Sequence, residues 1–134
     1  LSILETDLVQ ISQAIINQTL DKIKIKFSKK ATVCKYLVPN GYPDGPAKNE
    51  KIQIGKIPQN AKLYYASVEQ KDDGIYTTGS RAIACLGIAD SLEKAEKISE
   101  EATKSVKGNL FHRKDIGTKK LIEKRVNHMK EILG

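Results

Sequence analysis

The sequence has no tryptophan, only two cysteines, and few aromatic residues, which make up 5% of its 134 residues. It also lacks any run of about 20 apolar residues, the length that a membrane-spanning helix needs. No basic segment leads into an apolar run near the start, which argues against a secretory signal. With 40% hydrophobic residues, the chain can still bury the core of one domain, built mainly from Ile, Leu, Val and Ala.

The two cysteines, Cys34 and Cys85, each lie inside an apolar run. This placement favours buried free thiols over a disulfide, because nothing else in the sequence indicates secretion. A zinc site needs closely spaced ligands, whereas these cysteines and the two histidines, His112 and His128, are far apart. We therefore expect no metal site and a cytoplasmic protein.

Positive charge gathers in the last quarter of the chain. Residues 104–134 hold nine Lys or Arg and three Asp or Glu, a net charge of +6, out of +7 for the whole sequence. Such a field attracts phosphate groups, whether on a nucleic acid, a lipid surface or a small metabolite. It is equally consistent with the solvated face of a terminal helix.

In the first three quarters of the chain, the sequence predicts one helix followed by a series of strands. Thr6 can cap a helix over about residues 6–19, with Leu8, Ile11 and Ile15 on one face. Asp73-Gly74 predicts a hairpin turn. The pattern of apolar residues predicts strands at 23–27, 31–38, 51–54, 62–68 and 75–88, the last with a break at Gly79.

Two helices follow these strands. Asp90 and Glu93 have the spacing of a capping box, and Gly108 can end the helix that they begin. A final helix is expected after Thr118, with an apolar stripe facing the core, formed by Ile122, Val126, Met129 and Leu133. The sequence thus predicts an α+β fold: a small antiparallel β-sheet, barrel-like or a sandwich, with a leading helix and two C-terminal helices.

The sequence contains no complete active site. It has no phosphate-binding Gly-x-x-x-x-Gly-Lys loop, and Gly74, Gly79 and Gly87 do not form a dinucleotide fingerprint. No serine lies in a nucleophile elbow. We therefore assign no catalytic residue and no metal ligand to this chain.

Two short segments nevertheless suit an anion. In the first, Gly79 and Ser80 precede Arg81, so backbone N–H groups and a guanidinium can face the same ligand. A β-bulge with a surface arginine is the commoner meaning of this pattern.

In the second segment, Arg113 and Lys114 adjoin Asp115, and Gly117 can bring the backbone close to a ligand. The alternative is that Asp115 only pairs with Arg113 and holds the turn.

These two segments resemble the C-terminal domain of the phosphoribosylamine–glycine ligase family. The run at 111–117, aromatic-x-Arg-basic-Asp-Ile-Gly, is the most specific part, and residues 79–84 and 86–88 precede it in the family's order. Residues 41–43 and 4–8 also resemble that family, so the likeness covers essentially the whole chain. Ser80 stands where the family usually has a second glycine before the arginine.

The resemblance implies an ATP-grasp ligase of de novo purine biosynthesis, which joins 5-phosphoribosylamine to glycine with ATP and magnesium or manganese. Glycine's carboxylate is then activated as an acyl phosphate, which the ribosylamine nitrogen attacks. The nucleotide and metal ligands would lie in the ATP-grasp part, so this chain alone is expected to hold no cofactor and to be inactive. Because the chain begins with Leu1 and its one methionine is Met129, we expect it to be a piece of a longer protein.

Within that piece, we expect a single domain over residues 1–134, in which 1–20 form a helix that follows the ATP-grasp part and 21–134 form the C-terminal domain proper. The domain would pack on the ATP-grasp part and help to close the substrate cleft. Its candidate phosphate-binding residues are Arg113, Lys114, Arg81 and Ser80, supported by Asp115, Gly117 and Gly79.

Two other functions stay open at this point. A basic nucleic-acid-binding module would explain the isoelectric point of about 9.4, but the few aromatic residues and the absence of a reading motif count against it. A purely structural packing domain would use its cations for solubility. Within the ligase interpretation, neither a nucleic acid nor a membrane is expected as a partner.

Overall fold

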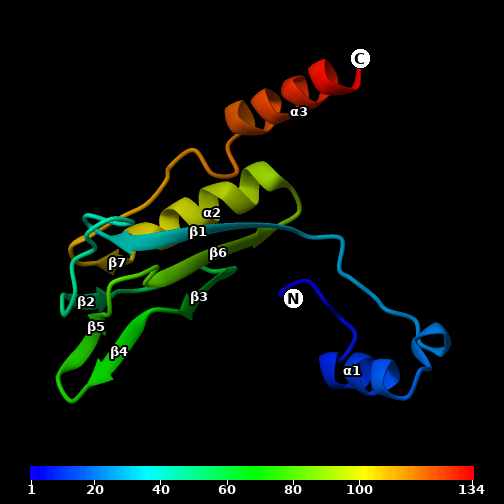
Figure 1. The fold of residues 1–134 in the computed structure, drawn as a ribbon, viewed down its shortest axis with the longest axis horizontal. Coiled ribbons are helices and arrows are strands. Elements are labelled where there is room, and N and C mark those ends of the chain that lie inside the picture. Colours follow the sequence, from blue (N-terminus) through cyan, green and yellow to red (C-terminus); the bar gives the residue numbers. More distant parts are fainter.

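The computed structural model describes residues 1–134 and shows an α+β fold with two small antiparallel sheets (Figure 1). The first sheet has the strand order β3-β6-β1-β8 and the second has the order β4-β5-β2-β7. Neither closes into a barrel, so the barrel-like form of the expected sheet is wrong. The strands are β1 (Ala31–Pro39), β2 (Lys51–Ile54), β3 (Ala61–Tyr65), β4 (Val68–Lys71), β5 (Gly74–Thr77), β6 (Ile83–Ala89), β7 (Val106–Lys107) and β8 (Leu110–Phe111).

Strand β1 organises the first sheet. It pairs with β6 from Ala31 to Leu37, and its last two residues pair with β8. Side chains of a strand alternate between the two faces of the sheet. Accordingly, Lys35 is buried on one face of β1, whereas Cys34 and Tyr36 are exposed on the other. The prediction of a buried thiol is therefore confirmed for Cys85 and wrong for Cys34.

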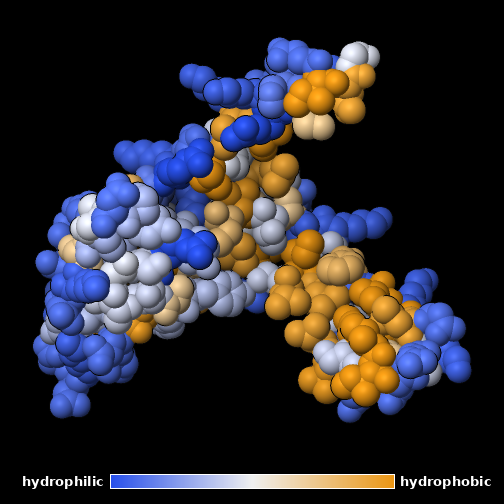
Figure 2. Space-filling model, viewed as in Figure 1, coloured by the Kyte–Doolittle hydropathy of each residue, from blue (hydrophilic) through white to orange (hydrophobic).

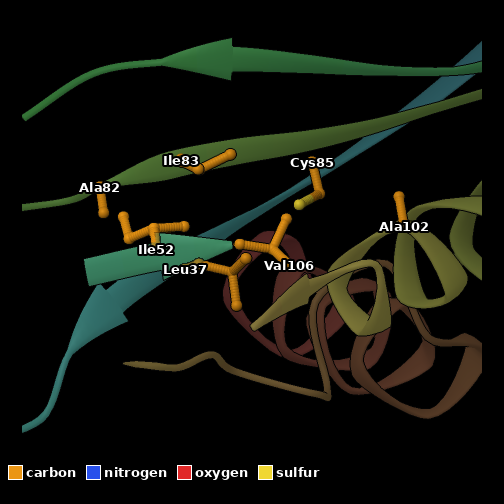
Figure 3. Close-up of a cluster of buried hydrophobic side chains, with 7 residues drawn as sticks. All are labelled: Leu37, Ile52, Ala82, Ile83, Cys85, Ala102 and Val106. Carbon is orange, nitrogen blue, oxygen red and sulfur yellow. The ribbon is translucent and has the colours of Figure 1, made fainter. Parts of the chain in front are cut away.

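Helix α2 (Leu92–Lys104) packs across β1 and β6. The buried apolar cluster beneath it joins both sheets and includes Leu37, Ile52, Ala82, Ile83, Cys85, Ala102 and Val106 (Figure 3). Gly87 of β6 permits this close packing, because a Cβ atom there would lie 2.1 Å from the carbonyl oxygen of Ala95. The helix thus lies directly on the backbone of the sheet.

Three helical segments lie around this body. Helix α1 (Leu8–Ile16), the short helix η1 (Leu20–Lys22) and helix α3 (Lys119–Leu133) extend away from the sheets (Figure 1). Apolar side chains gather on the surface of α1 (Figure 2). None of the helices combines the length and the hydropathy that a membrane span requires.

The apolar stripe of α3 does not face the core. Val126, Met129 and Leu133 are 47%, 50% and 77% exposed, so the predicted orientation is wrong. An amphipathic pattern shows that a helix has an apolar face but not what covers that face. Here α2 already occupies the face of the first sheet on which a C-terminal helix could pack.

Two of the predicted strands are also wrong. Residues 23–27 form no strand, and only Phe27 makes a bridge, to Leu4, because no neighbouring strand offers a ladder of hydrogen bonds. The stretch 62–68 is split, since β3 ends at Tyr65 and β4 begins at Val68 in the other sheet. Residues 78–82 likewise carry the chain from the second sheet back to the first.

Two helix caps are shifted by one residue. Asp7, and not Thr6, caps α1 by accepting hydrogen bonds from the backbone N–H groups of the first turn. Ser91, and not Asp90, caps α2, while Asp90 pairs with Lys30.

Other local predictions are confirmed. Strands β1 and β2 form where expected, and Asp73-Gly74 turns between β4 and β5. Thr118 caps α3 by accepting a hydrogen bond from the N–H of Leu121.

Candidate functional site

A cavity of about 360 Å³ beside β1 brings together both arginine-bearing segments of the sequence. Six of its eight lining residues are apolar, and the other two are arginines: Cys34, Tyr36, Val38, Tyr42, Arg81, Phe111, Arg113 and Ile116. A largely apolar hollow with a few charged groups is typical of a small-molecule site. Other hollows lie along α3 or between surface lysines, away from both segments.

The alternation of β1 builds the cavity wall. Residues Cys34, Tyr36 and Val38 point to the side opposite α2 and line the cavity. Strand β8 pairs with the end of β1, which brings Phe111 beside Val38. From there the chain continues through Arg113 to Ile116, which complete this side of the cavity.

Arg81 enters the cavity from the segment that connects the two sheets. Its guanidinium lies over the ring of Tyr36, 5.3 Å from the ring centroid, in a cation–π arrangement. No carboxylate lies within salt-bridge distance of it, whereas Arg113 has one. Arg81 is therefore the cation of this cavity whose charge no acidic side chain neutralises.

Arg113 pairs with Asp115 through two hydrogen bonds. Its Nε donates to Oδ1 at 3.1 Å and its Nη2 donates to Oδ2 at 2.7 Å. These bonds raise the pKa of Arg113 and lower the pKa of Asp115. The ion pair considered from the sequence is thus present, but it does not exclude a ligand, because a guanidinium has five N–H donors and three remain.

The backbone before Arg81 has free donors. The N–H groups of Gly79, Ser80 and Arg81 find no acceptor in the chain. Gly79 has a φ of +99°, which favours glycine, and the aliphatic chain of Lys48 packs against it. Lys48 is a cation near this segment that no local sequence signal indicates.

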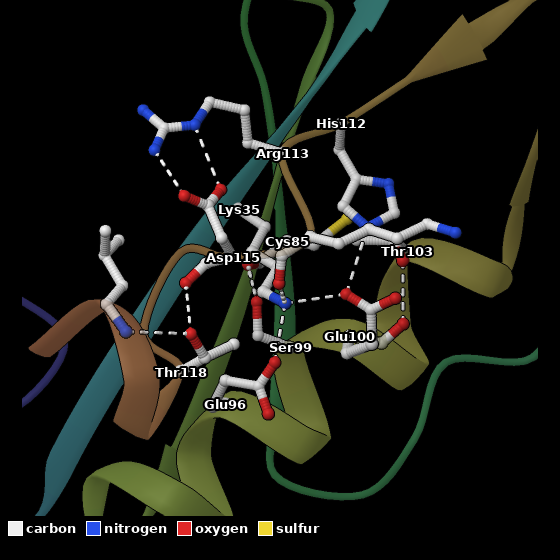
Figure 4. A network of polar contacts seen from close by, with 12 residues as sticks. Lys35, Cys85, Glu96, Ser99, Glu100, Thr103, His112, Arg113, Asp115 and Thr118 are labelled. Carbon is white, nitrogen blue, oxygen red and sulfur yellow. Dashed lines mark hydrogen bonds and ion pairs between the residues drawn. The ribbon is translucent and has the colours of Figure 1, made fainter.

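The turn that carries Arg113 is held from the other side of β1 (Figure 4). The amine of Lys35 donates to Glu96 at 2.7 Å, to Glu100 at 2.6 Å and to the carbonyl of Lys114 at 3.0 Å. Burial by itself lowers the pKa of Lys35, but the hydrogen bonds and charges of both glutamates outweigh this effect and raise it. Burial likewise acts to raise the pKa of Glu100, yet its bonds to Lys35 and His112 lower it.

The sequence-predicted residues divide into two groups. Arg81 and Arg113 meet at one cavity, although 31 positions separate them in the sequence. Ser80 and Lys114 do not line that cavity, and the carbonyl of Lys114 faces Lys35 instead. Gly117 lies close to Val33 of β1, since a Cβ atom at position 117 would lie 2.6 Å from Cγ1 of Val33. Gly117 therefore allows the turn to pack closely against β1, and it does not bring the backbone to a ligand.

Sequence reasoning missed the aromatic wall and the buried lysine. Tyr36 and Phe111 could have been found from the period of two along β1 and from the position of the next strand. The contact between Lys35 and the turn joins residues far apart in the sequence, and no local signal indicates it.

No three His, Cys, Asp or Glu side chains converge as a metal site would require. The expectation that ATP and its metal bind in another part of a longer protein stays a prediction.

Comparison with known proteins identifies relatives along the whole chain. The profile of the family described as phosphoribosylglycinamide synthetase, C domain, matches residues 32–119. The phosphoribosylamine–glycine ligases of Methanosarcina acetivorans and Methanocaldococcus jannaschii are 52% and 48% identical over 98% of this chain. The chain spans only 30% of the length of these relatives.

A solved structure agrees with this match. The crystal structure of the phosphoribosylamine–glycine ligase from Thermotoga maritima superposes with a TM-score of 0.54 and 30% identity. The superposition covers 60% of this chain and 20% of that one.

Proposed function

The chain belongs to the phosphoribosylglycinamide synthetase C-domain family, and from this premise we propose that it is the C-terminal part of a phosphoribosylamine–glycine ligase. The enzyme would join 5-phosphoribosylamine to glycine at the expense of ATP, as part of purine biosynthesis. The named relatives, which are about three times as long, support this proposal. The cytoplasmic location expected from the sequence is part of it.

In this proposal the rest of the enzyme supplies ATP binding, the metal and the reacting groups. This chain contributes by packing on that part, closing the substrate cleft and holding the substrate. Such a contribution is substantial in a ligase of this kind, because phosphoryl transfer depends on positioning and charge stabilisation. The isolated chain would then have no turnover of its own.

The substrate group that best suits the cavity is the 5-phosphate of phosphoribosylamine. The observation that carries this assignment is that Arg81 and Arg113 line one apolar cavity. Arginine suits phosphate because its planar fork meets two phosphate oxygens and stays charged at any working pH. The open N–H groups of residues 79–81 offer additional donors beside it.

The phosphate would act as a handle remote from the bond being formed. Binding energy from such a group raises kcat/KM by holding the reactive amine in place. Since Asp115 already neutralises part of the charge of Arg113, Arg81 supplies the larger share of uncompensated positive charge. Lys114 and Ser80 would contribute less, because they lie outside the cavity wall.

The experiment uses the full-length enzyme with Arg81→Ala and Arg113→Ala. Hydrogen bonds to charged groups contribute ~1.5–3 kcal/mol, so each variant should lower kcat/KM for phosphoribosylamine by roughly 10- to 100-fold. The KM for ATP and the melting temperature should change little.

Arg125→Ala is the matched control, since it removes an exposed arginine from α3, away from the cavity. If a well-folded Arg81→Ala, Arg113→Ala double variant kept wild-type kinetics, the phosphate site would be wrong and the domain would have a purely structural role. A loss confined to stability would have the same meaning.

A further inference from the structure

Lys35 is the one fully buried charged residue of the chain, and it lies near the middle of β1. Its side chain has no exposed area. Removing an ammonium group from water costs free energy that only close partners can offset. The partners of this amine therefore indicate what the buried charge does.

All three hydrogens of the amine are used. Two partners, Glu96 and Glu100, lie one turn apart on α2, and the third is the backbone carbonyl of Lys114. The two carboxylates already compensate the charge and fix α2 to β1. The third hydrogen bond leaves the helix and reaches the turn that carries Arg113 (Figure 4).

A second contact holds the same turn. Glu100 uses the oxygen that accepts from Lys35 to contact Nε2 of His112 at 3.0 Å. The cluster of Lys35, Glu96, Glu100 and His112 thus holds the residues on both sides of Arg113, at 112 and at 114.

Arg113 itself points the other way. Its side chain lines the cavity on the opposite face of β1, together with Tyr36, whereas Lys35 faces α2. Because the residues at positions 112 and 114 are held, the direction in which the side chain of Arg113 leaves the backbone is fixed. Beyond this, only the exposed contact with Asp115 restrains the guanidinium.

We propose that Lys35 is a positioning residue for substrate binding, which acts through the carbonyl of Lys114 and through Glu100 and His112 to keep Arg113 at the cavity. The inference rests on the proposed function, in which Arg113 binds the substrate phosphate. The buried charge touches no ligand and still determines how well one is bound.

The test uses Lys35→Met in the full-length enzyme. Displacing a binding group slightly is enough to lower kcat/KM for phosphoribosylamine about tenfold, while the KM for ATP stays unchanged. In a background of Arg113→Ala, Lys35→Met should have no further effect on kcat/KM, because the residue through which it acts is gone.

Two further variants keep the test decisive. His112→Ala removes one anchor of the turn and retains Lys35 with both carboxylates, so it serves if Lys35→Met does not fold, and its effect should also vanish with Arg113→Ala. Ser99→Ala is the control, because the Ser99 hydroxyl ties α2 to the carbonyl of Cys85 at 2.8 Å without touching the turn. It should lower stability and leave kcat/KM unchanged.

The outcomes separate this inference from the function on which it rests. Wild-type kcat/KM in folded Lys35→Met or His112→Ala enzyme, or a loss that adds in full to that of Arg113→Ala, would overturn the role of Lys35 alone. Unchanged kinetics in Arg113→Ala would overturn the proposed phosphate site, and the role of Lys35 with it.

Discussion

Replacing Gly87 by alanine should strongly destabilise the 134-residue chain. The added Cβ would lie 2.1 Å from the carbonyl oxygen of Ala95 and 2.6 Å from the backbone nitrogen of Ser99. Both atoms belong to the backbone of α2, so no rotation of a side chain relieves the contact. The helix would have to move away from the sheet by about 1 Å to restore normal van der Waals distances.

The cost follows from what that movement opens. Ala95, Ser99 and Ala102 are fully buried between α2 and the sheet. Overpacking costs about 1–3 kcal/mol where neighbours can adjust, and a rigid helix backbone places Gly87→Ala at the upper end of that range. For a chain of this size, about 3 kcal/mol corresponds to a fall in melting temperature of roughly 10 °C.

Thermal and urea unfolding monitored by circular dichroism would measure this loss. Gly45→Ala is the matched control, because a Cβ at Gly45 has nothing within 4 Å. It should change stability by no more than about 0.5 kcal/mol. If Gly87→Ala melted within two or three degrees of the wild type, about as the control does, α2 could not lie on β6 as described.

Three other results are expected. Tyr42→Phe in the full-length enzyme should leave catalysis nearly intact, because Tyr42 lines the cavity and we expect it to contribute its apolar ring and not its hydroxyl; a large loss of rate at unchanged stability would mean that the hydroxyl contacts substrate. Glu100 has its pKa lowered below the usual 4.5 in the folded chain, so it stabilises the fold above that pH and the effect disappears as pH falls through the lower value. Between pH 6 and pH 3, the free energy of unfolding should therefore fall more steeply in the wild type than in Glu100→Gln. Equal slopes of the two curves would contradict this. Binding to nucleic acid, measured across salt concentrations, should be weak and independent of sequence, because the clustered charge supports little beyond counterion release; submicromolar affinity for a particular RNA or DNA at physiological salt would favour the nucleic-acid-binding alternative.

The fold could be predicted from the sequence where local signals decide. The strand expected at 31–38, the Asp73-Gly74 turn and the cap at Thr118 each depend on a few neighbouring residues, and each is confirmed. The strand expected at 23–27 fails because a strand also needs a partner. The apolar stripe of α3 fails for a related reason, since the pattern does not say which surface covers it.

The candidate site shows the same division. Arg81 and Arg113 stood out individually, but their meeting depends on β1 and β8, which bring distant residues together. The motif at 111–117 did not show which of its two cations would line the cavity. In the structure Arg113 lines it, whereas the backbone carbonyl of Lys114 accepts a hydrogen bond from Lys35. Such long-range contacts are set by the topology of the sheet, which no local pattern encodes.

The most direct test of the phosphate-binding role is the preference of the full-length enzyme for a phosphorylated ligand. Titration calorimetry would compare the product of the proposed reaction, glycinamide ribonucleotide, with the same molecule lacking its 5-phosphate. The wild type should bind the phosphorylated form roughly 10- to 100-fold more tightly, and the Arg81→Ala, Arg113→Ala double variant should lose most of that preference. An undiminished preference in a well-folded double variant would contradict the account.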